Sequence, residues 1–149
     1  MTRRTLLALP LALRLRADAA SDVWSLIGDA ADALSQGSLT GFLDCFDPKM
    51  PGYEELRANV TALIAEGPDP NRRTDREGIF CSIDLVSEDG DDKSRALELD
   101  WILDIRAQTS GVGSTRRQQR VKARVEKQGK KWRIVALDPI AFFAPPDSH

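Results

Sequence analysis

The stretch Leu99–Arg106, LDWILDIR, alternates apolar residues with mostly charged ones at a period of two. Successive side chains of a β-strand point to opposite faces, so this period predicts a strand with one buried face. Asp100 and Asp104 then share the second face with Glu98 and Arg106. The buried row is predicted to hold Leu99, Trp101, Leu103 and Ile105.

The two aspartates raise the question of a catalytic acid pair, which the next strand answers. Residues 117–127 have an apolar row at Val121, Ala123 and Val125. Matching this row to the buried one places on the aspartates' face Arg120, Lys122 and Arg124. Two registers are open: one sets Asp104 opposite Arg120 and Asp100 opposite Arg124, and the other shifts each pairing by two residues. Each acid then has a base opposite or diagonal to it, which predicts a cross-strand ladder of ion pairs and no catalytic residue.

The same period predicts three further strands, so that four antiparallel strands form a meander over residues 79–86, 97–106, 117–127 and 131 to about 143. Gln128-Gly129 makes the last hairpin turn, and Asp138 before Pro139 breaks the last strand. The outer face of this sheet also carries apolar residues among its charges. Such a mixture often marks a protein contact, so we expect a homodimer through this face. The predicted dimer face contains Phe80, Ile102, Val135 and Leu137.

Helical periodicity fills the first half of the chain. Residues 21–36, 38–46 and 53–66 repeat apolar side chains at steps of three and four, which predicts three helices. Ser38 is a candidate N-cap, and Asp47-Pro48 ends the second helix because proline disfavours helical geometry in the residue before it. Helices followed by an antiparallel sheet indicate an α+β fold in which the helices cover one face of a bent four-stranded sheet.

The N-terminus has the pattern of an export signal. Arg3 and Arg4 precede an apolar run over residues 5–13, and Ala17-Asp18-Ala19 offers a small-x-small cleavage motif. We therefore expect a signal peptide over residues 1–19, a single domain over 20–144 and an unstructured tail over 145–149. TRRTLL also resembles a twin-arginine signal, so the general secretory and twin-arginine routes both stay open. The expected location is periplasmic or extracellular.

Composition limits the function classes. With 149 residues, 42% hydrophobic and 30% charged, the chain fits one globular domain, and its longest apolar run is too short to span a membrane. Removal of residues 1–19 would change the formal net charge from -2 to -5, which argues against nucleic-acid binding. Cys45 and Cys81 lie in apolar segments, and their pairing is left open. Because the one histidine is His149 and no Cys-x-x-Cys occurs, no metal or cofactor is predicted.

Two segments carry a resemblance to a known family. Residues 23–48, VWSLIGDAADALSQGSLTGFLDCFDP, and residues 125–137, VEKQGKKWRIVAL, resemble the helical opening and closing hairpin of the nuclear transport factor 2-like superfamily. The resemblance covers residues 21–143 and implies a cone-shaped α+β fold. Members include isomerases, dehydratases and polyketide cyclases as well as transport factors and non-catalytic binding or assembly domains.

The chain departs from the catalytic members of that superfamily. It has no histidine before residue 149, and its one tyrosine, Tyr53, matches no family catalytic position. We therefore expect an exported, non-catalytic domain that binds a small apolar ligand or an envelope protein. An isomerase or polyketide-cyclase type of enzyme and a subunit of an envelope assembly are the alternatives. The residues expected to line a ligand cavity are Trp24, Tyr53, Trp101 and Trp132.

Overall fold

The computed structural model describes residues 11–66, 78–107 and 113–145. The expected order of helices before strands is confirmed. The helical elements are α2 (Leu11–Ser35), α3 (Leu39–Leu43), α4 (Tyr53–Glu66) and the short 3-10 helix η2 (Ile140–Phe143). The strands are β1 (Gly78–Gly90), β2 (Ser94–Ala107), β3 (Gly113–Gln128) and β4 (Lys131–Asp138).

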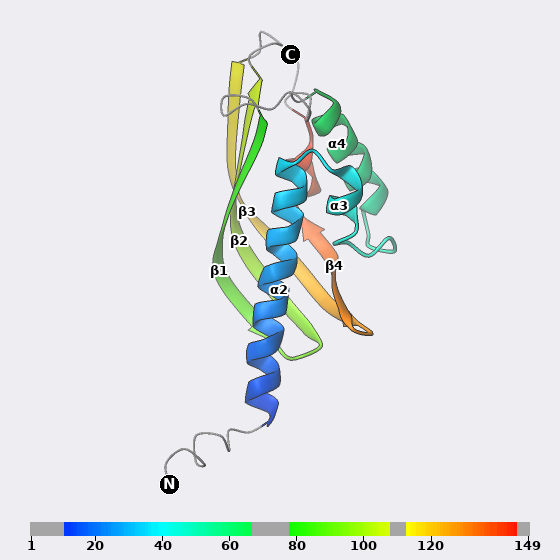
Figure 1. The fold of residues 1–149 in the computed structure, drawn as a ribbon, viewed down its shortest axis with the longest axis vertical. Coiled ribbons are helices and arrows are strands. Elements are labelled where there is room, and N and C mark those ends of the chain that lie inside the picture. Colours follow the sequence, from blue (N-terminus) through cyan, green and yellow to red (C-terminus); the bar gives the residue numbers. More distant parts are fainter. Residues whose placement is uncertain (1–10, 67–77, 108–112, 146–149) are drawn as a thin grey trace.

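The four strands form one antiparallel meander in the order β1-β2-β3-β4. The helices lie on one side of it, and α2 lies along the sheet (Figure 1). The LDWILDIR stretch lies in β2, and its predicted buried row faces this helical layer. The four side chains of this row are all buried, as are Val121, Ala123 and Val125 of β3.

The predicted register between β2 and β3 is wrong. Asp100 lies opposite Arg120 and Asp104 opposite Arg116, which neither of the two expected registers allows. The reason is that β3 begins at Gly113, opposite Ala107, four residues before its expected start. The difference is an even number of residues, so every side chain keeps its predicted face.

The predicted ladder of ion pairs is present in part. Arg120 lies 3.5 Å from Asp100 through Nε and 3.3 Å from Glu98 through a terminal nitrogen. Asp104 pairs within its own strand, at 2.9 Å from Arg106. Both aspartates thus belong to the outward, charged face of the sheet.

Helix α2 starts earlier than the sequence pattern predicts. It continues without a break through Ala19 and Ala20, where the cleavage site was expected, and Ala19 is buried against the core. The segment between Leu11 and Gly28 holds no glycine or proline, so nothing in it interrupts helical geometry. None of the helices among the described residues is long and apolar enough to cross a membrane.

The segment around α3 closes one edge of the sheet. Ser38 caps the helix as predicted, because its hydroxyl accepts a hydrogen bond from the Gly41 N–H at 3.1 Å. Beyond the helix, Ile134 of β4 donates to the Cys45 carbonyl at 2.8 Å and accepts from the Asp47 N–H at 2.9 Å. The free edge of β4 is therefore paired over this short stretch.

The last strand is shorter than expected. β4 ends at Asp138, the Asp138–Pro139 peptide bond is cis, and residues 140–143 form η2 instead of more strand. Two phenylalanines of η2 enter the core between the sheet and the helices. Phe143 packs edge-on against Trp101 with ring centroids 5.0 Å apart, and it also contacts Phe42 at 5.8 Å. This aromatic cluster occupies the interior of the fold.

Candidate functional site

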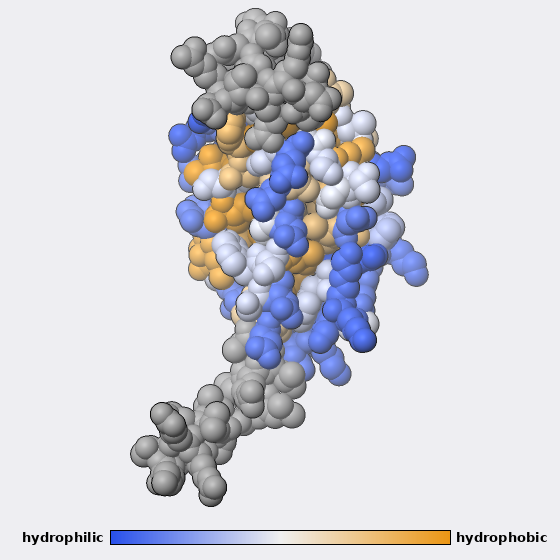
Figure 2. All heavy atoms as spheres, in the orientation of Figure 1, coloured by the Kyte–Doolittle hydropathy of each residue, from blue (hydrophilic) through white to orange (hydrophobic). Residues whose placement is uncertain are grey.

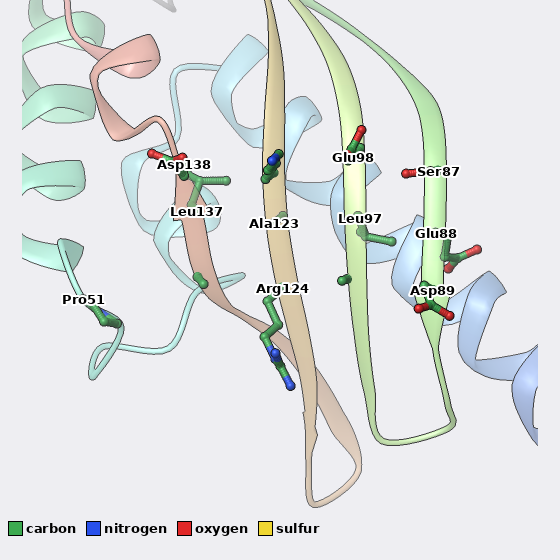
Figure 3. A pocket seen from close by; sticks show the side chains of 13 residues that line it. Pro51, Ser87, Glu88, Asp89, Leu97, Glu98, Ala123, Arg124, Leu137 and Asp138 are labelled. Atoms are coloured by element: carbon green, nitrogen blue, oxygen red, sulfur yellow. The ribbon is translucent and has the colours of Figure 1, made fainter.

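A hollow of about 520 Å³ opens on the face of the sheet that is turned away from the helices (Figure 3). Each of the four strands contributes three consecutive residues to it, and Pro51 from the loop before α4 completes the wall. We call this hollow the outer trough. The strand residues that line it are Ser87, Glu88, Asp89, Ala96, Leu97, Glu98, Lys122, Ala123, Arg124, Ala136, Leu137 and Asp138.

Two β-bulges lie beside the outer trough. One interrupts β1 at Val86, and the other interrupts β4 at Val135, so both edge strands are irregular beside the trough. A bulge bends its strand and increases the local twist, which hollows an otherwise flat face. The short side chains of Ala96 and Ala136 flank Arg124 and deepen the hollow on either side of it.

Charges of both signs surround the outer trough. Lys122 lies opposite Glu98 on one side and opposite Asp138 on the other. Glu98 also pairs with Arg120 at 3.3 Å, and Arg124 lies 3.7 Å from a carboxylate oxygen of Glu126. These pairs are partly exposed and contribute little to stability, so the charges remain able to pair with a bound molecule. The arrangement can hold a ligand that carries polar or zwitterionic groups around a small apolar part.

Comparisons with known proteins address the fold. No family model matches this chain, and no curated protein sequence matches it either. Among solved structures, a protein from Novosphingobium aromaticivorans named "Putative Scytalone Dehydratase" is 8% identical, with a TM-score of 0.70 over 84% of this chain and 85% of that one. An NTF-2 like protein of unknown function from Shewanella oneidensis is 13% identical, with a TM-score of 0.56 over 79% and 95%. A protein with a cystatin-like fold from Nostoc punctiforme, also of unknown function, is 16% identical, with a TM-score of 0.55 over 80% and 91%.

The chain has the nuclear transport factor 2-like fold. Identities of this size show the fold alone, and the proteins that share it include one named as a dehydratase and others of unknown function. The helical layer and the helix-facing side of the sheet form the cone of this fold.

The residues predicted to line a cavity in the cone are not brought together. Trp24 is 44% exposed on the surface of α2, so its assignment to a cavity is wrong. Trp101 is 1% exposed and packs in the aromatic cluster. Trp132 is 5% exposed and borders a smaller hollow of about 280 Å³ between α2 and the β3–β4 hairpin. Tyr53 is half-buried at the first position of α4.

Of the residues predicted for a dimer face, Phe80 and Ile102 lie on the outer side of the sheet, and the outward placement of Leu137 is wrong. Phe80 and Ile102 are half-buried on the outer side of the sheet, and the Arg106 guanidinium lies 4.5 Å from the Phe80 ring centroid. Leu137 lies opposite Ala123 in the helix-facing row and is 7% exposed. The bulge at Val135 adds one residue to β4, which turns Leu137 to the other face and leaves Val135 half-buried.

Few ionisable groups face the interior of the nuclear transport factor 2-like cone. Cys45 and Cys81 are free thiols, and burial raises the pKa of each to about 11. Ser35 and Trp101 lie near Cys81 and oppose this rise, although the Trp101 indole N–H makes no hydrogen bond of ordinary geometry. Arg117 donates to the Phe142 carbonyl at 2.8 Å, and its burial lowers the pKa of the guanidinium. In the described part of the chain, no three His, Cys, Asp or Glu side chains are grouped to hold a metal ion.

Sequence reasoning missed the outer trough. Glu98, Lys122 and Arg124 were interpreted as members of a ladder of ion pairs, and the depth of the trough depends on two bulges that no local pattern marks. One signal was present in the sequence. Ala96 and Ala136 are small residues at outward positions of strands whose other outward residues are mostly long and charged.

Proposed function

We propose that the chain is an exported, non-catalytic binding domain that holds a small molecule or a segment of another protein on the outer face of its sheet. The outer trough carries this proposal. Its volume of about 520 Å³ falls in the range of ligand sites, and it combines a small apolar floor with charges of both signs.

The interior of the cone favours binding over catalysis. The inward positions of β2 are apolar from Leu97 to Ile105, and aromatic rings fill the space that a substrate would need. Among the described residues, the inward-facing acid Glu88 is paired with Arg95. An isomerase, dehydratase or cyclase type of enzyme needs a base or a donor that faces a bound substrate. The name of the Novosphingobium protein keeps that class as the alternative.

Native mass spectrometry of the chain purified from its own envelope fraction tests the proposal. We expect a retained small molecule or a bound protein. Ala136→Leu fills the trough and should release the bound species, whereas Ala65→Leu makes the same change on the exposed side of α4 and should retain it. A bound species that Ala136→Leu retains, or one that the protein converts to a product, would contradict the proposal.

Export is part of this proposal, and the N-terminal pattern of residues 1–19 supports it. Because Ala19 packs against the core, we expect cleavage to precede the packing of α2. Mass spectrometry of envelope material should then find a mature N-terminus near Ala20. A full-length form confined to the cytoplasm would reject export.

The third part of the proposal is self-association through the outer face of the sheet. Phe80 and Ile102 support it, because they expose apolar surface among charged neighbours. Ile102→Lys should halve the mass measured by light scattering, and Thr61→Lys on α4 should leave that mass unchanged. An unchanged mass for Ile102→Lys would reject this dimer, and a heteromeric complex would favour the envelope-assembly alternative.

A further inference from the structure

A second surface, which shares only Asp89 with the outer trough, also points to a partner. Three large apolar side chains are well exposed in the part of the chain that the structure describes: Trp24 at 44%, Leu85 at 44% and Val86 at 45%. Trp24 belongs to α2, and the other two belong to β1. Figure 2 shows apolar atoms reaching the surface along the margin of the molecule where β1 lies in Figure 1.

The three side chains lie at one level of the fold. Ser35 of α2 lies near Cys81 of β1, and the two elements run in opposite directions (Figure 1). Trp24 is on the same helical stripe as Ser35, eleven residues earlier, which is about 16 Å along a helix. Leu85 and Val86 follow Cys81 by four and five residues, which is about 13 to 16 Å along a strand. The similar distances place Trp24 at the level of Leu85 and Val86.

This level coincides with an unpaired edge of the sheet. Among the described residues, β1 pairs with β2 alone, so its second edge has no neighbouring strand. The bulge at Val86 brings an extra apolar residue to this edge. An edge of this kind offers backbone hydrogen-bonding groups to an extended segment.

The charge around the apolar residues is negative. Residues 18–35 of α2 and all of β1 contain no lysine or arginine. Asp84 and Asp89 are exposed on β1, and Asp32 of α2 lies close enough to Cys81 to act on its charge. Asp84 lies opposite a second acid, Asp100, whose charge is paired with Arg120. We call the six residues Trp24, Asp32, Asp84, Leu85, Val86 and Asp89 the edge patch.

We propose that the edge patch binds an extended, basic segment of another protein, with an apolar side chain of that segment against Trp24, Leu85 and Val86. Charge complementarity selects this partner, because all three charged residues of the patch are acidic. A second copy paired through the same edge would bring Asp84 and Asp89 of both chains together, which like-charge repulsion opposes. Contact with the basic outer face of β3 in another copy would make the mass of the protein grow with concentration, which the test below measures.

Trp24 supplies the probe for the test. Trp101 and Trp132 are 1% and 5% exposed, so a change in the exposed tryptophan signal on binding comes from Trp24. The probe ligands are capped hexapeptides of alternating leucine and lysine, leucine and glutamate, or serine and lysine. The leucine–lysine peptide should bind saturably and shift the emission to the blue, and each of the other two should bind at least tenfold more weakly. Trp24→Phe should abolish the shift.

Variants separate the edge patch from general attraction between opposite charges. Asp84→Lys and the double variant Leu85→Ser/Val86→Ser should each lower the affinity for the leucine–lysine peptide at least tenfold, as measured by calorimetry. Glu55→Lys makes the same charge change at an exposed position of α4 and should lower the affinity for this peptide less than twofold. Equal weakening by Asp84→Lys and Glu55→Lys would overturn the proposal, as would tight binding of the leucine–glutamate peptide. Growth of the protein's own mass with concentration, lost in Leu85→Ser/Val86→Ser, would overturn it in favour of a second copy.

Discussion

Nε of Arg95 lies 2.8 Å from a carboxylate oxygen of Glu88, and the two side chains are only 9% and 17% exposed. A terminal nitrogen of Arg95 also donates to the Asp91 carbonyl at 2.9 Å. Arg95 is the one buried charged residue in the described part of the chain. The pair joins β1, just after its bulge, to the start of β2, and it stabilises the end of the sheet where the outer trough lies.

Removal of one partner of this pair should cost more than removal of both. Glu88→Gln leaves the Arg95 charge buried without compensation, so we expect a loss of about 3 kcal/mol in the free energy of unfolding. The double variant Glu88→Leu/Arg95→Met replaces the pair by apolar side chains and should lie within about 1 kcal/mol of the parent. Urea denaturation measures the free energy of unfolding of both variants, provided that its dependence on urea concentration has the same slope as in the parent. Equal losses in the single and double variants would contradict this account.

The two thiols should be inert in the folded protein. With each pKa near 11, about 0.1% of either thiol is ionised at pH 8, so alkylation should be slow until the chain unfolds. The unfolded thiols ionise near 9.0, so the folded state is favoured fully below that pH. Stability should then fall as the pH rises from 9 to 11, and it should fall less in the Cys45→Ala/Cys81→Ala variant. Rapid labelling of the folded chain at pH 8 would contradict the burial of these groups.

Arg117 should hold η2 against the sheet. Its guanidinium donates to the Phe142 carbonyl, and Phe142 and Phe143 both pack against Trp101. Arg117→Gln should lower the free energy of unfolding by about 2 kcal/mol and change the near-ultraviolet circular dichroism of the aromatic cluster. Arg116→Gln, at the exposed neighbouring position, is the control and should change neither. The same loss in both variants would mean that net charge, and not the contact with Phe142, is responsible.

Asp47 links the loop after α3 to the β3–β4 hairpin. The Lys49 backbone N–H donates to it at 2.9 Å and the Gln128 side chain at 2.7 Å, and both hold the pKa of this carboxyl below its usual 3.8. Its contribution is therefore complete above pH 3.8 and is lost as the pH falls through the lower folded value. Asp47→Asn should be less stable than the parent at pH 7, and the difference should shrink in strong acid.

Chemical denaturation at pH 7 and in strong acid measures this difference. Asp44→Asn, on the exposed C-terminal side of α3, is the control and should change stability at pH 7 by less than about 0.5 kcal/mol. A stability gap for Asp47→Asn that stayed constant with pH would contradict the role of the carboxylate charge.

Local periodicity predicted much of the fold. The alternation around Trp101 and the helical steps before Gly37 correctly indicated which elements form and which of their faces are buried. The Ser38 cap also followed from residue type, because capping acts over a few residues.

Candidate sites were predicted less well. Trp24 carries an aromatic side chain at a helical position, and the sequence pattern does not distinguish a cavity wall from an exposed margin. The alternation of β4 holds up to the bulge at Val135, and beyond the bulge Leu137 faces the opposite side from the one that the alternation predicts. Both errors concern which neighbour a side chain meets, and the neighbours come from distant parts of the chain.

The sequence by itself determined the α+β order, the buried row of β2 and the charged outer face, because burial leaves a period of two or of 3.6 in the residues themselves. Only the tertiary structure decided the offset between β2 and β3, the two bulges, the outer trough and the exposure of Trp24 and Leu85. Those features depend on pairing between segments that are far apart in the chain. A shift by an even number of residues, or a bulge of one residue, moves the neighbours of a side chain without changing the local pattern that predicts its strand.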